Sequence, residues 1–146
     1  MRTILIRDYE PEDFMDISDR CEPMKEDRET QWAYAMRHKQ ATHAETFVVD
    51  GKVAACGGFH KLWDGTAEVW LVLADDFKNS PSVVMKLKER LDTWMYVEHF
   101  VRLQALCKQD WLSGRRFLEW LGMKYEATLR KMGPNGVDQT LYAKVL

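Results

Sequence analysis

Apolar and polar positions alternate along several short stretches of the chain, and this two-residue period is typical of β-strands. Together with runs of residues that favour strands, it predicts strands at residues 3–7, 46–49, 52–59, 66–73, 101–107, 125–131 and 139–145. Asp50-Gly51 separates the second of these stretches from the third, and such a pair readily adopts the positive φ angles of a two-residue hairpin turn. Residues 66–73 are apolar on both alternating faces except at Glu68, which predicts a central strand.

Helical periodicity fills the intervals between the strands. Helices are predicted at residues 12–18, 26–40, 80–100 and 110–121, the second with a stripe of Trp32, Ala35, Met36 and Lys39. Ser80-Pro81 is a favourable helix start, because serine caps the first turn and proline at the first helical position needs no N–H donor. The resulting mixed order of strands and helices favours one sheet with helices on its faces, which is the α+β class.

Length, composition and charge restrict the kind of protein. A chain of 146 residues with 46% apolar residues suits a single domain over residues 1–146. Its formal net charge is only -2, so we expect no nucleic-acid partner and no binding to an anionic membrane. The apolar run at residues 70–74 is far shorter than the roughly 18 residues that span a bilayer. The N-terminus has no secretory pattern, so a cytoplasmic location is expected.

Cysteine, histidine and tryptophan can each carry special chemistry. Cysteine and histidine lack ligand spacing, so we expect neither a metal site nor a disulfide framework. Six tryptophans are many for this length, and each large ring must be buried or presented to a partner. Trp32, Trp70 and Trp94 fall on predicted core faces. Trp63 in a turn and Trp111 at a helix start are candidates for a groove or an interface.

Two segments resemble the GNAT (acyl-CoA N-acyltransferase) family. Residues 116–123, Arg-Phe-Leu-Glu-Trp-Leu-Gly-Met, stand where the family has an aromatic-rich helix ending in Leu-Gly-Phe, and Ser80-Pro81 stands where it has its acyl-CoA loop. The resemblance covers nearly the whole chain. It implies a GNAT-like mixed, mostly antiparallel sheet of about seven strands with about four helices on its faces. It also implies an acetyltransferase that uses acetyl-CoA and a small-molecule or protein amine.

The resemblance places an acetyl-CoA site on the fourth strand and the loop after it. The family's phosphate-binding pattern, Arg/Gln-x-x-Gly-x-Gly/Ala, falls on residues 78–83, where Pro81 removes one N–H donor and Val83 adds bulk. The N–H groups of Ser82, Val83 and Val84 are expected to remain available at the helix start. The implied cofactor-binding residues are Leu71, Val72, Leu73, Lys78, Asn79, Ser80, Ser82 and Val83. The alternative is that this segment only caps a helix.

The family also uses a base, often a glutamate on the fourth strand, and a tyrosine that protonates the leaving thiolate. Glu68 matches the base and would take the amine proton through water, unless it lies at a frayed, solvated strand end. Leu118 matches the tyrosine and cannot give a proton. An active enzyme would then need another acid, such as Cys107 or Tyr125, or would release thiolate to solvent.

The leucine at position 118 and the glycine-poor loop are also similar to a narrower group, the GNAT-like proteins of short-tailed bacteriophages. These are internal virion or assembly proteins, and the match rests on residues 68–71 and 116–122. It implies a non-enzymatic scaffold that contacts a phage or host protein in the host cytoplasm or the virion. The sequence leaves the enzyme and the assembly protein as two open hypotheses.

Overall fold

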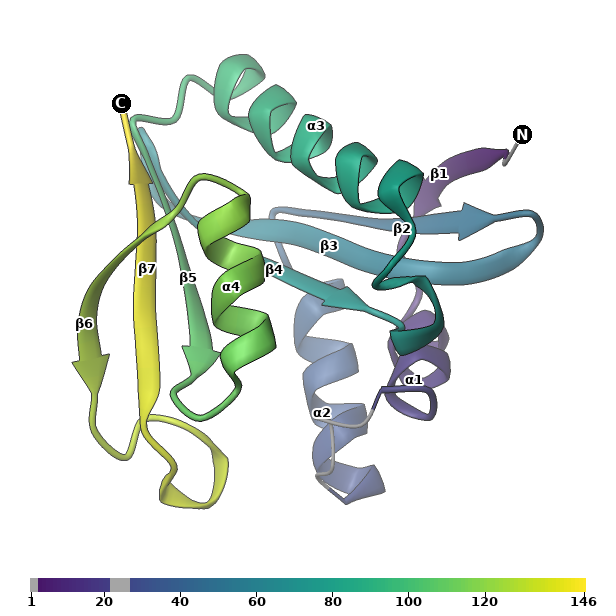
Figure 1. Ribbon diagram of the computed structural model, residues 1–146, viewed down its shortest axis with the longest axis horizontal. Coiled ribbons are helices and arrows are strands. Elements are labelled where there is room, and N and C mark those ends of the chain that lie inside the picture. Colours follow the sequence, from purple (N-terminus) through teal and green to yellow (C-terminus); the bar gives the residue numbers. More distant parts are fainter. Residues whose placement is uncertain (1–2, 22–26) are drawn as a thin grey trace. The chain divides into compact units, whose positions relative to one another are not determined.

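The computed structural model describes residues 3–21 and 27–146, and its strands form a seven-stranded sheet (Figure 1). The strand order is β1-β2-β3-β4-β5-β7-β6. Neighbours pair antiparallel at β1–β2, β2–β3, β5–β7 and β6–β7, whereas β4 and β5 are parallel. The strands are β1 Ile4–Asp8, β2 His43–Val49, β3 Lys52–Trp63, β4 Thr66–Leu73, β5 Arg102–Lys108, β6 Lys124–Leu129 and β7 Gln139–Val145.

The α-helices of the described residues are α1 Pro11–Ser18, α2 Arg28–Lys39, α3 Pro81–Val97 and α4 Leu112–Trp120. The mostly antiparallel sheet and these helices confirm the predicted α+β fold class. Residue 26, predicted to be helical, lies outside the described residues. Within them α2 begins after Asp27, whose carboxylate accepts a hydrogen bond from the Thr30 N–H at 2.9 Å and so caps the helix.

The hairpin between β2 and β3 turns where the sequence predicts it. Asp50 and Gly51 have φ angles of 50° and 84°, and Val49 pairs directly with Lys52 across the turn. Both strands are longer than predicted, because β2 begins at His43 and β3 continues to Trp63. The positive φ angles of the two turn residues therefore set the register of this hairpin.

By its internal contacts the chain divides into two compact units. The first comprises Met1–His60 and Trp70–Glu89, and the second comprises Lys61–Val69 and Arg90–Leu146. In the first unit α1 and α2 pack together, and the core includes Tyr9, Phe14, Ile17, Ala35, Val49 and Cys56. In the second unit α4 contacts β5 and β6, and the buried side chains include Leu103, Leu118, Leu121, Met123 and Tyr142.

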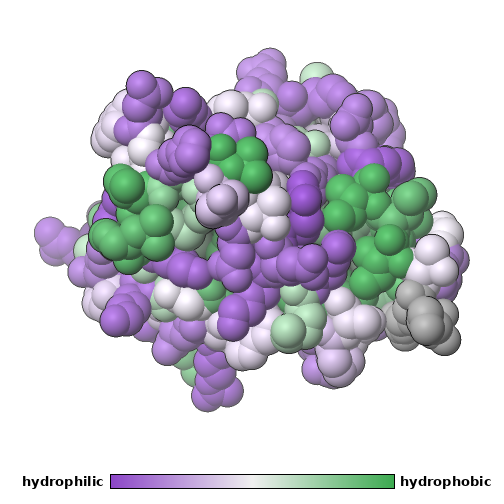
Figure 2. All heavy atoms as spheres, turned by 90° about the horizontal axis from the view of Figure 1, so that it is seen from above, coloured by the Kyte–Doolittle hydropathy of each residue, from purple (hydrophilic) through white to green (hydrophobic). Residues whose placement is uncertain are grey.

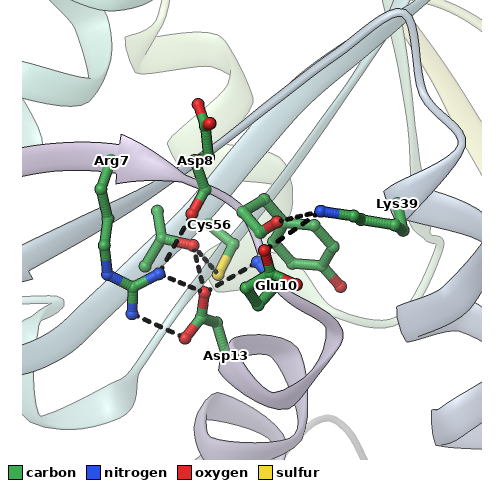
Figure 3. A network of polar contacts seen from close by, with 8 residues as sticks. Arg7, Asp8, Glu10, Asp13, Lys39 and Cys56 are labelled. Atoms are coloured by element: carbon green, nitrogen blue, oxygen red, sulfur yellow. Dashed lines mark hydrogen bonds and ion pairs between the residues drawn. The ribbon is translucent and has the colours of Figure 1, made fainter.

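A buried carboxylate ties together β1, α1 and β2 in the first unit (Figure 3). The Arg7 guanidinium donates two hydrogen bonds of 2.8 Å to Asp13, whose side chain is only 8% exposed. Asp13 also accepts from the Thr46 hydroxyl at 2.7 Å and from the Glu10 N–H at 3.0 Å. Burial by itself raises the pKa of Asp13, but the hydrogen bonds from Arg7, Thr46 and Glu10 lower that pKa overall.

Helix α2 turns a different face to the core from the one predicted. Gln31 and Ala35 are buried, while Trp32 and Met36 are 42% and 40% exposed. The predicted core position of Trp32 is therefore wrong. The Tyr9 hydroxyl donates to the Ala35 carbonyl at 2.8 Å, and this contact orients the Ala35 face of the helix inward.

The other tryptophans lie closer to expectation. Trp94 is 4% exposed, which confirms its predicted core position, and Trp70 is half-buried. Trp63, predicted in a turn, is instead the last residue of β3 and is 66% exposed, while Trp111, directly before α4, is 36% exposed. The ring of Trp111 lies so close to Gly114 that a Cβ there would be 2.5 Å from the indole.

We expect Asp13→Ala to lower the free energy of unfolding by about 2–4 kcal/mol, because it leaves the Thr46 hydroxyl and the Glu10 N–H without their acceptor. Asp16→Ala, which removes an exposed i,i+4 ion pair with Arg20, is the control and should cost less than about 0.5 kcal/mol. Urea unfolding at pH 7 measures both variants. Equal losses would show that the buried carboxylate has no special role.

Candidate functional site

The segment between β4 and α3 is the predicted acyl-CoA loop, and it lies entirely in the first unit. A short 3-10 turn, Asp75–Phe77, follows β4 and anchors the loop through the buried Phe77 ring. The Ser80 N–H donates to the Phe77 carbonyl at 3.0 Å, and the hydroxyls of Ser80 and Ser82 lie 3.3 Å apart. These contacts bring the chain into α3 at Pro81.

Two backbone donors remain at the start of α3. Pro81 has no N–H, and the Val84 N–H, expected to be available, donates instead to the Ser80 carbonyl at 3.1 Å. The N–H groups of Ser82 and Val83 belong to the first turn and have no acceptor within the helix. The Val83 side chain is only 1% exposed and belongs to the core cluster of the first unit. Its bulk is therefore in the core and not on the loop surface, contrary to the sequence analysis.

The electrostatic surroundings of this loop are set by three cations. Asp76 is bound by Arg20, at 3.0 Å to each carboxylate oxygen, and by Lys52 at 2.7 Å. Burial raises the pKa of Asp76, but hydrogen bonds from Lys52 and Arg20 lower that pKa overall, so the carboxylate stays ionised. The two cations balance its negative charge. Lys78 is exposed and forms no ion pair within the described ranges. Lys78 is thus an exposed cation two residues before Ser80, which precedes α3.

The end of β4 that precedes the loop is apolar. Leu71, Val72 and Leu73 are half-buried, so only their backbone groups can bind a polar cofactor. Leu71 lies in space left by Gly57 of β3, where an added Cβ would be 2.3 Å from the leucine Cδ2 atom. The Ala74 N–H then donates to the Ala54 carbonyl at 2.9 Å, which fixes the strand end.

Glu68, the predicted base, lies in the second unit. It is the third residue of β4 and is half-buried, so it is not at a frayed strand end. In the parallel register it faces Gln104 of β5, whose side-chain N–H donates to a Glu68 oxygen at 3.5 Å. Among the described residues, Gln104 is the side-chain donor to this carboxylate.

The candidate acids, and the residue at the family's tyrosine position, also lie in the second unit. Leu118 is 8% exposed and has no proton to give. Cys107 is 6% exposed, and burial raises the pKa of its thiol to about 11, so the thiol holds its proton at neutral pH. Tyr125 is half exposed, and its hydroxyl lies 2.7 Å from the Thr128 hydroxyl. None of these observations assigns an acid.

One aromatic group was missed by the sequence analysis. His38 of α2 stacks on Trp70 of β4 with ring centroids 3.9 Å apart, and His60 lies 6.0 Å away. Burial, followed by the charges of His60 and Arg37, lowers the pKa of His38 to about 3, so the imidazole is neutral. The His38 Nδ1 and Trp70 Nε1 atoms are buried without a hydrogen-bond partner in the described part of the chain. No sequence spacing relates these residues; only the packing of α2 on the sheet brings them together.

Comparisons with known proteins identify the fold. No protein-family model matches the chain, and no curated protein sequence matches it. Solved structures do match: a GNAT-family acetyltransferase from Bacillus anthracis is 22% identical, with 97% of this chain and 94% of that chain covered and a TM-score of 0.74. Ard1 from Thermoplasma volcanium is 14% identical, with 98% and 97% covered and a TM-score of 0.80.

A microcin self-immunity acetyltransferase, solved in complex with acetyl-CoA and AMP, is 16% identical, with 98% of this chain and 92% of that chain covered and a TM-score of 0.73. At these identities the likeness shows that the chain has the GNAT fold, as its sequence resemblance implies. Across residues 3–21 and 27–146, no three His, Cys, Asp or Glu side chains are grouped so that they could hold a metal ion. No helix in the same ranges is long and apolar enough to cross a membrane.

The low pKa of His38 predicts sensitivity to acid. The unfolded chain binds a proton at this histidine below about pH 6.5, whereas the folded protein does so only near pH 3, so stability is lost as pH falls from 6.5 toward 3. We expect wild type to lose about 1–2 kcal/mol more than His38→Phe between pH 7 and pH 5. Urea unfolding at both pH values measures this. His99→Asn, which removes an exposed histidine, is the control; equal acid sensitivity of wild type and His38→Phe would contradict the prediction.

Proposed function

We propose that the protein transfers an acetyl group from acetyl-CoA to an amine. The observation that supports this most directly is the GNAT fold, which nearly the whole chain shares with acetyltransferases, one of them solved with acetyl-CoA. The chain also retains a helix start with two available N–H donors, at Ser82 and Val83, directly after the fourth strand. The acceptor would be a small-molecule or protein amine.

In this proposal the CoA pyrophosphate binds at the start of α3. The N–H groups of Ser82 and Val83 donate to phosphate oxygens, and the positive end of the helix dipole favours the anion. Lys78 supplies a cation, while Asn79 and Ser80 offer polar side chains next to it. The backbone of Leu71, Val72 and Leu73 binds the acyl-carrying arm of the cofactor and polarises the thioester carbonyl.

The proposed reaction is direct transfer. Glu68 accepts a proton from the amine through a water molecule, the amine nitrogen forms a bond to the thioester carbonyl carbon, and the carbon–sulfur bond breaks. The electron pair of that bond leaves with the sulfur as a thiolate. Leu118 has no acidic proton, and burial raises the pKa of the Cys107 thiol. The thiolate therefore takes its proton from solvent.

A second proposal is a non-enzymatic virion or assembly protein that uses the same scaffold for protein contacts. Its support is the exposed apolar surface: Trp63 is 66% exposed and Tyr96 is 82% exposed. Figure 2 shows hydrophobic side chains gathered in patches on the face that it draws. Surface aromatic residues of this kind are enriched at protein interfaces. A phage or host protein would be the partner.

Calorimetry with acetyl-CoA and with CoA separates the two proposals. We expect micromolar binding to wild type, and at least tenfold weaker binding to Ser82→Glu, because the new carboxylate repels the phosphates. An acidic residue in the first turn favours the helix, so this variant keeps its fold. Ser113→Glu is the matched control, since Ser113 is an exposed residue at the second position of α4. No binding to wild type at millimolar ligand would rule out the enzyme and leave the assembly protein.

Release of free CoA thiol from acetyl-CoA then tests the base. The acceptors are spermidine, lysine amide and a short peptide with a free N-terminus. For the amine that supports turnover, Glu68→Gln should lower kcat by about 10²–10⁴-fold, because a general base is lost. CoA binding by this variant should match wild type. Unchanged turnover would exclude Glu68 as the base while leaving the acetyltransferase proposal intact.

A further inference from the structure

The side chain of Glu68 is the end of a continuous line of hydrogen bonds in the second unit. Gln104 donates from its amide nitrogen to Glu68 at 3.5 Å, and its amide oxygen accepts from the Arg102 Nε–H at 3.1 Å. The two terminal nitrogens of Arg102 donate to the two oxygens of Glu126 at 3.0 and 2.7 Å. Three strands contribute to this line: β4, β5 and β6.

We propose that Gln104 and Arg102 are positioning residues for Glu68, and that Glu126 fixes their orientation. The inference rests on the proposed role of Glu68 as the base. The line of hydrogen bonds then does more than pair strands, because it holds the carboxylate of the base in one orientation. The second carboxylate oxygen is left for water or the amine.

The chemistry of each group makes the orientation of the line unambiguous. Arginine has only donors, so the Gln104 atom that contacts Arg102 must be the amide oxygen. The opposite end of that amide is then the nitrogen, which can only donate, and Glu68 is its acceptor. The bidentate contact with Glu126 holds the guanidinium plane, and in that orientation the Nε–H points at Gln104. No alternative amide orientation satisfies both neighbours.

Charge strengthens the line toward the base. The hydrogen bond from Arg102 lowers the pKa of Glu126, and the Glu126 contact raises the pKa of Arg102, so this pair stays ionised at neutral pH. An amide whose oxygen accepts from a cation is a stronger donor at its nitrogen. The 3.5 Å contact to Glu68 is long, as catalytic hydrogen bonds often are before substrate binds. We expect it to shorten in the complex.

The placement of these residues on β5 fits such a purpose. Leu103, Ala105 and Cys107 are buried on one face of the strand, whereas Arg102 and Gln104 are half-buried on the other. Within residues 3–21 and 27–146, the acidic side chains that the hydrogen bonds of Arg102 and Gln104 reach are the candidate base and Glu126.

The kinetic test uses the full chain and the acceptor found by thiol release. Gln104→Leu should lower kcat by about 10- to 100-fold, the worth of one hydrogen bond to a charged group, with the KM for acetyl-CoA unchanged. The acidic limb of the plot of kcat against pH should also move in this variant. Arg102→Met should lower kcat in the wild type but add little in the Gln104→Leu variant, because Arg102 acts through Gln104. If the kcat losses of Arg102→Met and Gln104→Leu were additive in the double variant, the proposal that Arg102 acts through Gln104 would be overturned.

Lys144→Met is the matched control. It removes an ion pair between Lys144 and Asp92 at 2.9 Å whose side chains are 26% and 52% exposed. The pair of Arg102 and Glu126, at 2.7 Å, has exposures of 27% and 38%. The control loses a comparable contact in the same unit, so its kcat and pH profile should match wild type. A control loss equal to that of Arg102→Met would also overturn the proposal.

A second measurement needs no acceptor and separates this inference from the proposed function. In proton–nitrogen NMR spectra the side-chain amide of Gln104 is identified by its loss in Gln104→Leu. Glu68→Leu and Arg102→Met should each shift that amide signal, and Lys144→Met should not. If the Gln104 signal does not shift in Glu68→Leu, the proposed line of hydrogen bonds is wrong whatever the activity. If the signal shifts but no amine is acetylated, the line of hydrogen bonds exists and the proposed function fails.

Discussion

The first unit depends on one buried carboxylate. Asp13 lies at the start of α1 and accepts hydrogen bonds from β1, from the backbone before the helix and from β2. A carboxylate with 8% of its side chain exposed is stable as an anion only when such donors replace water. The same contacts therefore fix where α1 begins and how it lies on the strands. Tyr9, the residue directly after β1, carries the constraint to α2 because its hydroxyl donates to the Ala35 carbonyl.

This constraint determines what α2 presents to the sheet and to solvent. With the Ala35 face inward, His38 reaches Trp70 and stays neutral because the site is desolvated. Trp32 and Met36 are left exposed on the other face, although both are apolar. The first unit thus buries the polar His38 ring and exposes the apolar side chains of Trp32 and Met36. The position of the helix is set by the buried hydrogen bonds, and the distribution of apolar residues along α2 does not override them.

The predicted acyl-CoA loop and the candidate base lie in a GNAT fold, but their local residues differ from the family pattern. At the start of α3 proline replaces a glycine, but the Ser82 and Val83 amides remain and the valine side chain packs into the core. On β5 two polar residues extend the surroundings of Glu68 to a distant ion pair. Position 118, where the family has a tyrosine, holds a buried leucine. The proposed chemistry therefore relies on backbone donors and solvent more than on side-chain acids.

The sequence by itself determined the elements whose signals are local. The Asp50-Gly51 turn, the strand at residues 66–73 and the helix start at Ser80-Pro81 depend on the conformational preferences of adjacent residues, and all three are observed. The GNAT resemblance was also readable, because it rests on element order and a short motif.

Only the tertiary structure decided which residues meet across elements. Contacts between residues far apart in the chain set the orientation of α2 and bury Val83. Such contacts also form the stack of His38 on Trp70 and the line of hydrogen bonds from Glu68 to Glu126. Burial and hydrogen-bond geometry select such contacts, and neither leaves a period or a spacing in the sequence. Glu68 could therefore be named from its strand, but the side chains that hold it could not.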